Sequence, residues 1–414
     1  MPARLIPALA AVALLAGCNA AADETPQTAA DTTPSDCQPI ETRAPNATNQ
    51  EPAFPGQTRA CEAESNVAFD VQVVATGLDH PWAVEPLPNG SLLVTERPGR
   101  MRVVSASGQV GAPITGLPPI DAGGQGGLLD VALSPAFASD RTIFWSFTEP
   151  RQGGNGTAVA RGRLSDDSRS VSDVRVLFRA LPTYDNEMHF GSRLAFGPDG
   201  MLYITTGERS DANMRQHAQR LDGHLGKTMR IAPDGTVPGD NPFVGRDGAQ
   251  PEIWTLGHRN IQAAAFDDDG QYWVIEHGTR GGDEINRIER GENYGWPVQA
   301  YGIEYRGGAI EGASTNPSGY RQPIYYWDPV IAPSGAEFYS GNAFPAWRGS
   351  LFIGGMVSTR LVRVVLENDR VVGEEHLLTN RGQRIRDVRE GPDGALYIVT
   401  DEDDGELWRI VPAG

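Results

Sequence analysis

The sequence predicts an all-β fold, a six-bladed β-propeller that spans residues 67–414. The chain of 414 residues contains 49 glycines and 31 prolines, a composition that favours many short turns over long helices. A unit of two apolar strands joined by an Asp-Gly or Asn-Gly turn returns along the chain, and a further alternating strand follows. A hairpin that recurs about every 50–70 residues, without helical periodicity between its copies, is typical of propeller blades.

Six copies of the hairpin define the expected blades in chain order. They span 81–95, 129–147, 192–205, 261–275, 336–353 and 386–400. Further strands are expected at 100–105, 226–231, 284–288, 361–366 and 406–411. Because blades are arranged radially, loops from different blades converge at one mouth of a central channel. We therefore expect the functional residues to be scattered over several loops.

The N-terminus predicts export and a lipid anchor. Arg4 precedes the apolar stretch 5–16, which is too short to span a bilayer comfortably. Residues 1–18 are expected to be a signal peptide, and Leu15-Ala16-Gly17-Cys18 matches a bacterial lipoprotein cleavage box with Cys18 as the lipidated residue. An ordinary cleaved signal peptide is the alternative. We expect a protein of the bacterial periplasm that contacts the membrane only through the lipid on Cys18.

Residues 19–66 are expected to form a flexible tether. They are rich in Ala, Thr, Pro and Asp and show little apolar periodicity. Cys37 and Cys61 lie in this stretch, and an oxidising periplasm would allow them to pair. Such a disulfide would cross-link the tether and would have no catalytic role.

The charge balance argues against a nucleic-acid partner. The chain has 35 Lys and Arg against 53 Asp and Glu, a net charge of −18, whereas binding to phosphates needs a basic surface. The chain also lacks a P-loop, a Gly-rich dinucleotide motif after a strand and a Gly-x-Ser-x-Gly elbow. Nucleotide, nicotinamide and serine-hydrolase chemistry therefore have no support.

Three loops carry polar residues that are candidates for a binding site. Gln125 lies among glycines, which let a ligand approach the backbone, and its side chain can donate and accept hydrogen bonds. His189 precedes a blade strand, and an imidazole can accept a proton near neutral pH. Arg259 can bind a carboxylate in a bidentate manner, and Asn260 can bind a hydroxyl or quinone oxygen. For Gln125 and His189, a flexible loop and a structural histidine are the alternatives.

Two further segments suggest ions. Arg384 and Arg386 point to the same side of an extended chain, and two guanidinium groups repel each other unless an anion lies between them. The pair favours a specific anion site over surface decoration, whereas 401–404 is expected to be a solvated turn. The segments 276–286 and 293–297 combine carboxylates with exposed carbonyls, which suits Ca²⁺, although acidic loops are often only solvated.

Together these motifs resemble the soluble aldose sugar dehydrogenases of the glucose/sorbosone dehydrogenase family, which depend on pyrroloquinoline quinone (PQQ). The resemblance covers roughly residues 69–411. It rests on the motifs at 79–82, 124–130, 189–193, 240–243, 281–286, 293–297 and 381–388, in the same order as in the family.

The resemblance implies oxidation of an aldose at C1 to the lactone, with PQQ as hydride acceptor, Ca²⁺ as its activator and an external electron acceptor. His189 would be the general base that takes the proton of the C1 hydroxyl. The positions that match PQQ contacts are Gln125, Arg259, Asn260, Tyr305, Arg384 and Arg386. Glu284 and the carbonyl of Tyr294 match one Ca²⁺ site, and the carbonyls of Gly278 and Thr279 match the second, which is bound to the cofactor.

Two positions depart from the family pattern, and two other functions stay open. Thr279 replaces a proline, where only a carbonyl is needed, and Val357 replaces a lysine that contacts PQQ; Arg360 is a possible substitute. A Ca²⁺-dependent lactonase on a six-bladed propeller would need Asp, Asn and Glu around one central metal, and has no use for paired arginines. A non-catalytic sugar-binding lipoprotein that has lost its cofactor would explain Val357.

Overall fold

The computed structural model describes Met1 and residues 37–414. The rest of the expected signal peptide, the expected lipid site at Cys18 and the first part of the expected tether lie outside the described residues. From residue 37 on, the chain is one compact unit of 23 strands, with the short helix α1 (Phe137–Asp140) and two 3-10 turns, η1 (Arg215–Gln219) and η2 (Pro345–Trp347). None of the described helices is long and apolar enough to cross a membrane.

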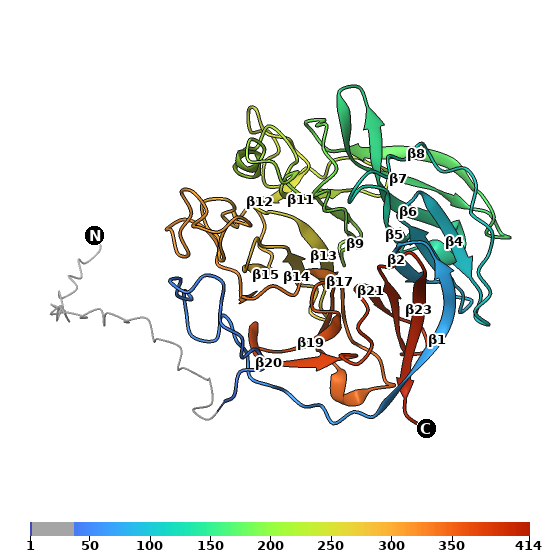
Figure 1. Ribbon diagram of the computed structural model, residues 1–414. Helices are drawn as coiled ribbons and strands as arrows, with labels where there is room; N and C mark the ends of the chain where they lie inside the picture. Colours follow the sequence, from blue (N-terminus) through green and yellow to red (C-terminus); the bar gives the residue numbers. More distant parts are fainter. Residues whose placement is uncertain (2–36) are drawn as a thin grey trace. The chain divides into compact units, whose positions relative to one another are not determined.

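Six antiparallel sheets form the six blades of a propeller, as the sequence predicts (Figure 1). Blade 1 contains β2 (Pro81–Pro86), β3 (Leu92–Glu96) and β4 (Arg100–Val104), and blade 2 contains β5 (Leu128–Leu133), β6 (Thr142–Arg151), β7 (Gly154–Leu164) and β8 (Val171–Arg179). Blade 3 contains β9 (Leu194–Phe196), β10 (Leu202–Thr205), β11 (Lys227–Ile231) and β12 (Ile253–Leu256), and blade 4 contains β13 (Ile261–Phe266), β14 (Tyr272–Glu276), β15 (Asp283–Arg287) and β16 (Tyr325–Trp327). Blade 5 contains β17 (Pro333–Phe338), β18 (Leu351–Gly355), β19 (Arg360–Glu367) and β20 (Arg370–Leu377), and blade 6 contains β21 (Ile385–Glu390), β22 (Leu396–Thr400), β23 (Gly405–Pro412) and β1 (Phe69–Leu78).

The repeated Asp-Gly turn has the same local cause in each clear copy. In blade 3 the Asp199 side chain accepts the N–H of Met201 at 3.0 Å, and Gly200 has a φ of +73°. In blade 6 Gly394 has the same φ of +73°. Glycine adopts this left-handed conformation without strain, so the dipeptide sets the hairpin that the sequence pattern predicts.

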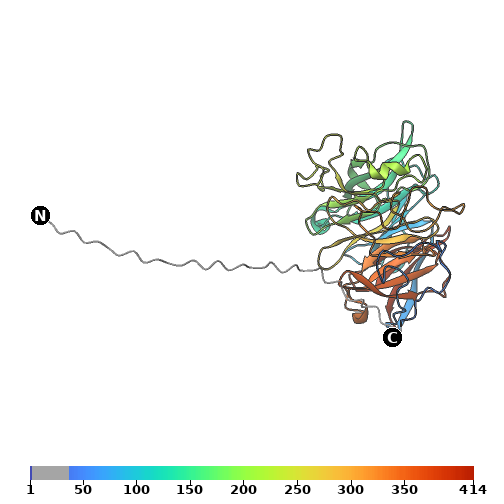
Figure 2. The ribbon, with the colours of Figure 1, turned by 90° about the vertical axis from the view of Figure 1, so that its left-hand side faces the viewer.

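The ring closes because the first and the last strand of the domain share blade 6. β1 pairs antiparallel with β23, with Phe69 opposite Pro412 and Leu78 opposite Gly405. In the side view, the blue β1 lies beside the red end of the chain (Figure 2). This pairing joins the two ends of the ring in one sheet, so no unpaired strand edge remains where they meet.

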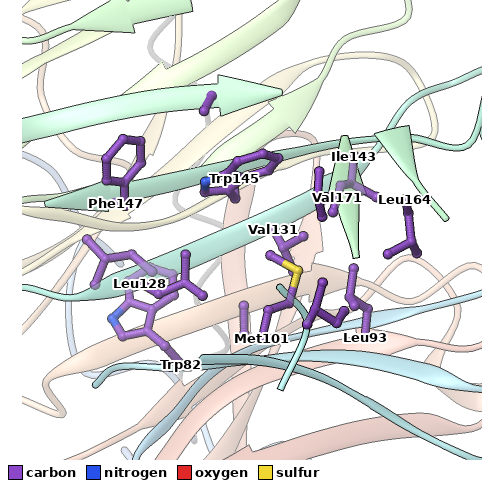
Figure 3. Close-up of a cluster of buried hydrophobic side chains, with 14 of the residues drawn as sticks. Trp82, Leu93, Met101, Leu128, Val131, Ile143, Trp145, Phe147, Leu164 and Val171 are labelled. Carbon is purple, nitrogen blue, oxygen red and sulfur yellow. The ribbon is translucent and has the colours of Figure 1, made fainter. Parts of the chain in front are cut away.

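The core lies between neighbouring blades. Between blades 1 and 2, Trp82 and Met101 of blade 1 pack in one cluster with Val131 and Trp145 of blade 2 (Figure 3). All four side chains are buried. The first strands of successive blades also contact one another and line the channel. This packing fixes how the blade ends face each other, and with that the geometry of the channel mouth.

A buried ion network joins the innermost strands across the channel. The guanidinium Nη1 of Arg193 lies 3.0 Å from the carboxylate oxygens of both Asp130 and Asp387. Asp130, in β5, also accepts the N–H of Leu194 in β9, and Asp387, in β21, accepts the N–H of Val84 in β2. Each carboxylate therefore ties one blade to the next.

Residues 37–66 differ from the flexible tether expected there. Cys37 and Cys61 form a disulfide with their Cα atoms 5.4 Å apart, which settles the pairing that the sequence had left open. The segment runs along the outer side of blades 4 and 5 (Figure 1), and its Gln57 side chain is fully buried. Although the segment is poor in apolar residues, hydrogen bonds from its backbone and polar side chains hold it in place.

The Arg193→Met variant tests the ion network. The change leaves two buried carboxylates without the cation between them, so we expect the free energy of unfolding to fall by about 3–5 kcal/mol, measured by urea denaturation. Arg163→Met is the control, because Arg163 forms an exposed pair with Asp166 and its loss is worth about 0.5 kcal/mol or less. A loss below about 1 kcal/mol in Arg193→Met would show that the network does not stabilise the ring.

Candidate active site

All six blades contribute to one cavity at the channel. It holds about 120 Å³ of space for water. Four residues proposed from the sequence line it: Gln125, Asn260, Arg384 and Arg386. The other lining residues are Trp82, Arg97, Leu129, Phe190, Gly191, Gln262, His277, Met356 and Asp401. The cavity wall is thus rich in hydrogen-bond donors and carries three arginines.

His189 lies directly before two lining residues of this cavity, Phe190 and Gly191. Its side chain is buried, with 3% of its surface exposed, and its φ of +49° is unusual for a residue other than glycine. The backbone N–H of His189 donates to Oε1 of Gln125 at 2.9 Å. The two candidates from separate loops are therefore in direct contact.

A carboxylate orients the His189 ring. Nδ1 lies 2.7 Å from Oε2 of Glu208, which follows β10 and is fully buried. Because an ionised carboxylate only accepts hydrogen bonds, the proton is assigned to Nδ1, and Nε2 keeps a free lone pair. Burial lowers the pKa of His189 below its ordinary value; the charge of Glu208 opposes this and that of Arg259 adds to it. The ring is therefore neutral at pH 7 and available as a base.

Blade 4 contains a second His–Glu pair that serves as a contrast. Nδ1 of His258 lies 2.8 Å from Oε1 of Glu276, but Nε2 of His258 also bonds the Thr255 hydroxyl at 2.9 Å. Both ring nitrogens of His258 are thus occupied. In His189, Nε2 makes no hydrogen bond with any residue that the structure describes, so His189 is the one of the two that can exchange a proton with a ligand.

The loop that carries His189 is held by a buried arginine. Arg209, next to Glu208 in the chain, donates from Nε to the carbonyl of Met188 at 2.9 Å and from Nη2 to Oδ1 of Asn155 at 2.7 Å. Its guanidinium lies over the Phe190 ring, 4.2 Å from the ring centre. Glu208 and Arg209 together therefore fix the ring and the backbone of the His189 loop.

The arginine pair faces an anion of the chain itself. Oδ2 of Asp401 lies 2.7 Å from Arg386 and 3.3 Å from Arg384. Burial by itself raises the pKa of Asp401, but Arg386 and Arg384 outweigh it and hold the pKa well below its usual range. The prediction of a solvated turn at 401–404 is therefore wrong for Asp401. Its ion pairs with the two guanidinium groups offset the free-energy cost of burying the carboxylate. Arg384 keeps 39% of its side chain exposed, and Nε of Arg386 has no partner among the described residues.

Arg259 lines a second, smaller cavity. Its Nη1 donates to the carbonyls of His277, at 3.1 Å, and of Gly278, and its Nη2 donates to the Tyr305 hydroxyl at 3.2 Å. Tyr305 is 56% exposed, so Arg259 reaches from the buried loop to the surface. His277 lines both cavities, and burial lowers its pKa to about 3.

The smaller cavity gathers three of the four residues proposed for calcium. Gly278, Glu284 and Tyr294 line it, together with Arg259. Thr279 does not line it but is buried beside Gly278. Burial and the charge of Glu276 raise the pKa of Glu284 well above its ordinary value. Among the described residues, no three His, Cys, Asp or Glu side chains converge as a metal site, so a cation here would depend on one carboxylate and on carbonyl oxygens.

Comparison with known proteins decides the family. The family model for glucose/sorbosone dehydrogenase matches residues 78–409. The chain belongs to the glucose/sorbosone dehydrogenase family. It is 45% identical to the aldose sugar dehydrogenase YliI of Escherichia coli strain K12, over 83% of this chain and 93% of that protein. The chain is accordingly a sugar dehydrogenase, an oxidoreductase.

Solved structures agree with this assignment. The apo form of the soluble aldose sugar dehydrogenase from Escherichia coli is 44% identical, with a TM-score of 0.80 over 83% of this chain and all of that chain. The PQQ-bound form of an aldose sugar dehydrogenase from Streptomyces coelicolor is 30% identical, with a TM-score of 0.68 over 83% of this chain and 99% of that chain.

Among the residues of this dehydrogenase's site that the sequence analysis did not propose are Glu208, His277 and Asp401. A signal existed for Glu208, because the second strand of each hairpin ends near a Thr or Glu, and Glu208 follows Thr205 at such an end. Asp401 stands in an acidic run that has the composition of an exposed turn. Only the position of Arg386 on the neighbouring strand shows why this one carboxylate is buried.

The Glu208→Gln variant tests the orientation of His189. Removing the carboxylate removes the attraction that raises the pKa of His189, so we expect the pKa to fall further. Ring ¹⁵N NMR of histidine-labelled protein between pH 4 and 8 measures it. Glu187→Gln, an exposed carboxylate two residues from His189, should leave the pKa unchanged.

The same shift sets the sign of the pH dependence of stability. Because the folded pKa of His189 lies below 6.5, its contribution to stability is complete above pH 6.5 and is lost as the pH falls and the unfolded chain takes up the proton. A pKa of His189 that rises or stays constant in Glu208→Gln would contradict the assigned contact.

Proposed function

We propose that this sugar dehydrogenase uses PQQ and Ca²⁺ to oxidise aldoses at C1 to the lactone, with His189 as the general base. The observation that carries the proposal is the convergence of Gln125, Asn260 and the two arginines on one cavity directly beside His189. The PQQ-bound relative from Streptomyces coelicolor supports the choice of cofactor.

The hydrogen-bond donors of the cavity suit a ligand with several carboxylates, and PQQ is such a ligand. Arg384 is partly exposed and Nε of Arg386 is unpartnered, so both guanidinium groups have donors left beyond Asp401. Gln125 and Asn260 add amide groups that bind carbonyl or carboxylate oxygens. Arginines bind carboxylates in a planar, bidentate manner, which fixes orientation as well as affinity.

The smaller cavity suits Ca²⁺. The Glu284 carboxylate and the carbonyl of Tyr294 would hold one Ca²⁺, and the carbonyls of Gly278 and Thr279 would hold the second, which is bound to the cofactor. All of these are the hard oxygen ligands that this ion prefers. The crowding of Glu284 by Glu276 would be relieved by a divalent cation. When bound, PQQ supplies a carbonyl that accepts a hydride, and Ca²⁺ polarises that carbonyl as a Lewis acid.

The chain's own residues handle the proton. Neutral His189 accepts the proton of the C1 hydroxyl at Nε2, while the carbon loses a hydride. The imidazolium that forms is stabilised by Glu208, whose carboxylate lies 2.7 Å from Nδ1. Arg209 and Gln125 keep the loop in place, so the base needs little reorganisation during the reaction.

The exported, lipid-anchored state remains part of the proposal. The Cys37–Cys61 disulfide is typical of oxidising compartments and supports export to the periplasm. We propose anchoring through Cys18 and transfer of electrons from the loaded site to an external acceptor. We propose no nucleic-acid partner, because a net charge of −18 disfavours binding to phosphates.

The His189→Ala variant tests the base. Purified protein loaded with PQQ and Ca²⁺ should reduce an artificial dye when an aldose is added, and His189→Ala should lower kcat by about 100- to 10,000-fold while PQQ still binds. His217→Asn, a half-buried histidine that lines neither cavity, should keep full activity.

Other outcomes separate the alternatives. Dye reduction that survives His189→Ala would refute the base. Hydrolysis of lactones without PQQ would favour the lactonase, and a titration with PQQ that gives no saturable heat would favour the sugar-binding protein.

The Val357→Lys variant tests whether a side chain at position 357, where relatives have a lysine, contacts PQQ. Val357 is 61% exposed and follows Met356, which lines the cavity. An added cation there should strengthen PQQ binding by about 2- to 5-fold, because a partly exposed ion pair is worth up to about 1 kcal/mol. The gain should shrink with added salt, and Val357→Met should show none. An affinity for PQQ that does not rise would exclude a contact from this position.

A further inference from the structure

We propose that the disulfide-closed segment 37–66, here called the strap, is part of the active-site scaffold: it positions the loops 278–282 and 301–305 beside Arg259. Asn46, Ala47 and Gln50 are the positioning residues. The identity of the ligand that these loops bind rests on the proposed function. The contacts that position the loops are independent of it.

The strap is anchored on two neighbouring blades. At blade 5, the N–H of Ala63 donates to the carbonyl of Glu374 in β20, and the N–H of Glu374 donates to the carbonyl of Cys61, both at 2.9 Å. At blade 4, the N–H of Tyr326 in β16 donates to the carbonyl of Gln57 at 2.9 Å. The strap therefore covers the outermost strands of both blades, and its disulfide closes it between these anchors.

The first positioning contact is the Asp328 carboxylate, which is 5% exposed. Oδ1 accepts the backbone N–H of Asn46 at 2.9 Å and its side-chain Nδ2 at 2.8 Å, and Oδ2 accepts the N–H of Ala47 at 2.9 Å. All three donors belong to the strap. The backbone of Gly281 packs directly on this carboxylate, because a Cβ on Gly281 would lie 2.6 Å from its Cγ. The strap thus reaches the loop 278–282 through one buried carboxylate.

The second contact is the Gln50 side chain, which pairs with both backbone groups of one residue. Its Oε1 accepts the N–H of Gly302 at 2.7 Å, and its Nε2 donates to the carbonyl of Gly302 at 2.9 Å. Gly302 has a φ of +94°, and a Cβ there would lie 2.4 Å from the carbonyl oxygen of Gly281. The next residue, Ile303, exchanges two backbone hydrogen bonds with Arg280, at 3.0 and 3.1 Å. The two loops therefore form one unit, and Gln50 holds it from outside.

The inner side of this unit is the candidate active site. The carbonyl of Gly278 accepts a hydrogen bond from Arg259, and the Tyr305 hydroxyl accepts another from the same guanidinium. Gly278 lies three residues before Gly281, and Tyr305 lies three residues after Gly302. The loops are thus held between the strap on one side and Arg259 on the other.

The strap lies outside the family match, which covers residues 78–409. Its contacts with the site loops are therefore an addition to the part of the domain that the family model describes. A segment that only covered the outer strands of the two blades would need no more than the anchors at Gln57 and Ala63. It would not need polar side chains that reach Gly302 and Asp328.

Hydrogen exchange in the full-length protein without PQQ and Ca²⁺ tests the inference. In the Asn46→Ala/Gln50→Ala double variant, we expect amide exchange in 278–305 to rise by at least about 10-fold, because the loops lose their outer support. Retention of PQQ and Ca²⁺ in the loaded protein should fall in parallel. Ser65→Ala is the matched control, since it removes a strap contact with Glu375 of blade 5 and should leave 278–305 unchanged.

The disulfide gives an independent second variant. Replacing Cys37 and Cys61 by serine should raise exchange in the same peptides. Unchanged exchange in 278–305 of the double variant, with only a lower Tm, would overturn the inference. The strap would then only stabilise the fold. Because exchange is measured without the cofactor, a protein that never binds PQQ would refute the proposed function and not this inference.

Discussion

The pairing of β1 with β23 closes the ring, and the active site depends on that closure. The cavity is lined by residues from all six blades, so no pair of blades contains it. Cores between blades, such as the one around Trp82 and Trp145, set the angle between neighbours, and the Arg193 network ties the innermost strands across the channel. An opening at any one seam would therefore disturb the wall of the cavity.

Two buried carboxylates at this site each have a partner, and some arginine donors remain. Asp401 lies against Arg384 and Arg386, and Glu208 lies against His189. In the first pair, Asp401 and the arginines offset the cost of burying each other's charge, which would otherwise be several kcal/mol. Because Asp401 does not use all the donors of the arginines, the cavity keeps the ability to bind an anion. Burial keeps the base His189 neutral, whereas ion pairing with the arginines keeps Asp401 charged, within one channel.

The sequence repeats predict the blades because each hairpin is locally determined. The Asp-Gly turn at Gly200 needs only its own sequence to form, and the alternating strands on either side follow from it. The candidates Gln125, Asn260, Arg384 and Arg386 were also found from the sequence, because glycine-rich and arginine-rich loops stand out from ordinary turns. The strap was expected to be flexible because its composition is polar, and composition says nothing of Asp328 or Gly302, some 280 and 250 residues away along the chain.

The sequence alone determined the all-β class, the six repeats and the residue types at the channel mouth, because hairpin formation and side-chain chemistry are local properties. The tertiary structure alone decided which groups meet: Glu208 with His189, Asp401 with the arginine pair, and the strap with the loops beside Arg259. The first two contacts join separate segments within one blade, and the third joins the strap to loops of blade 4. Their existence depends on the distance between groups after the ring has closed, which no local pattern in the chain encodes.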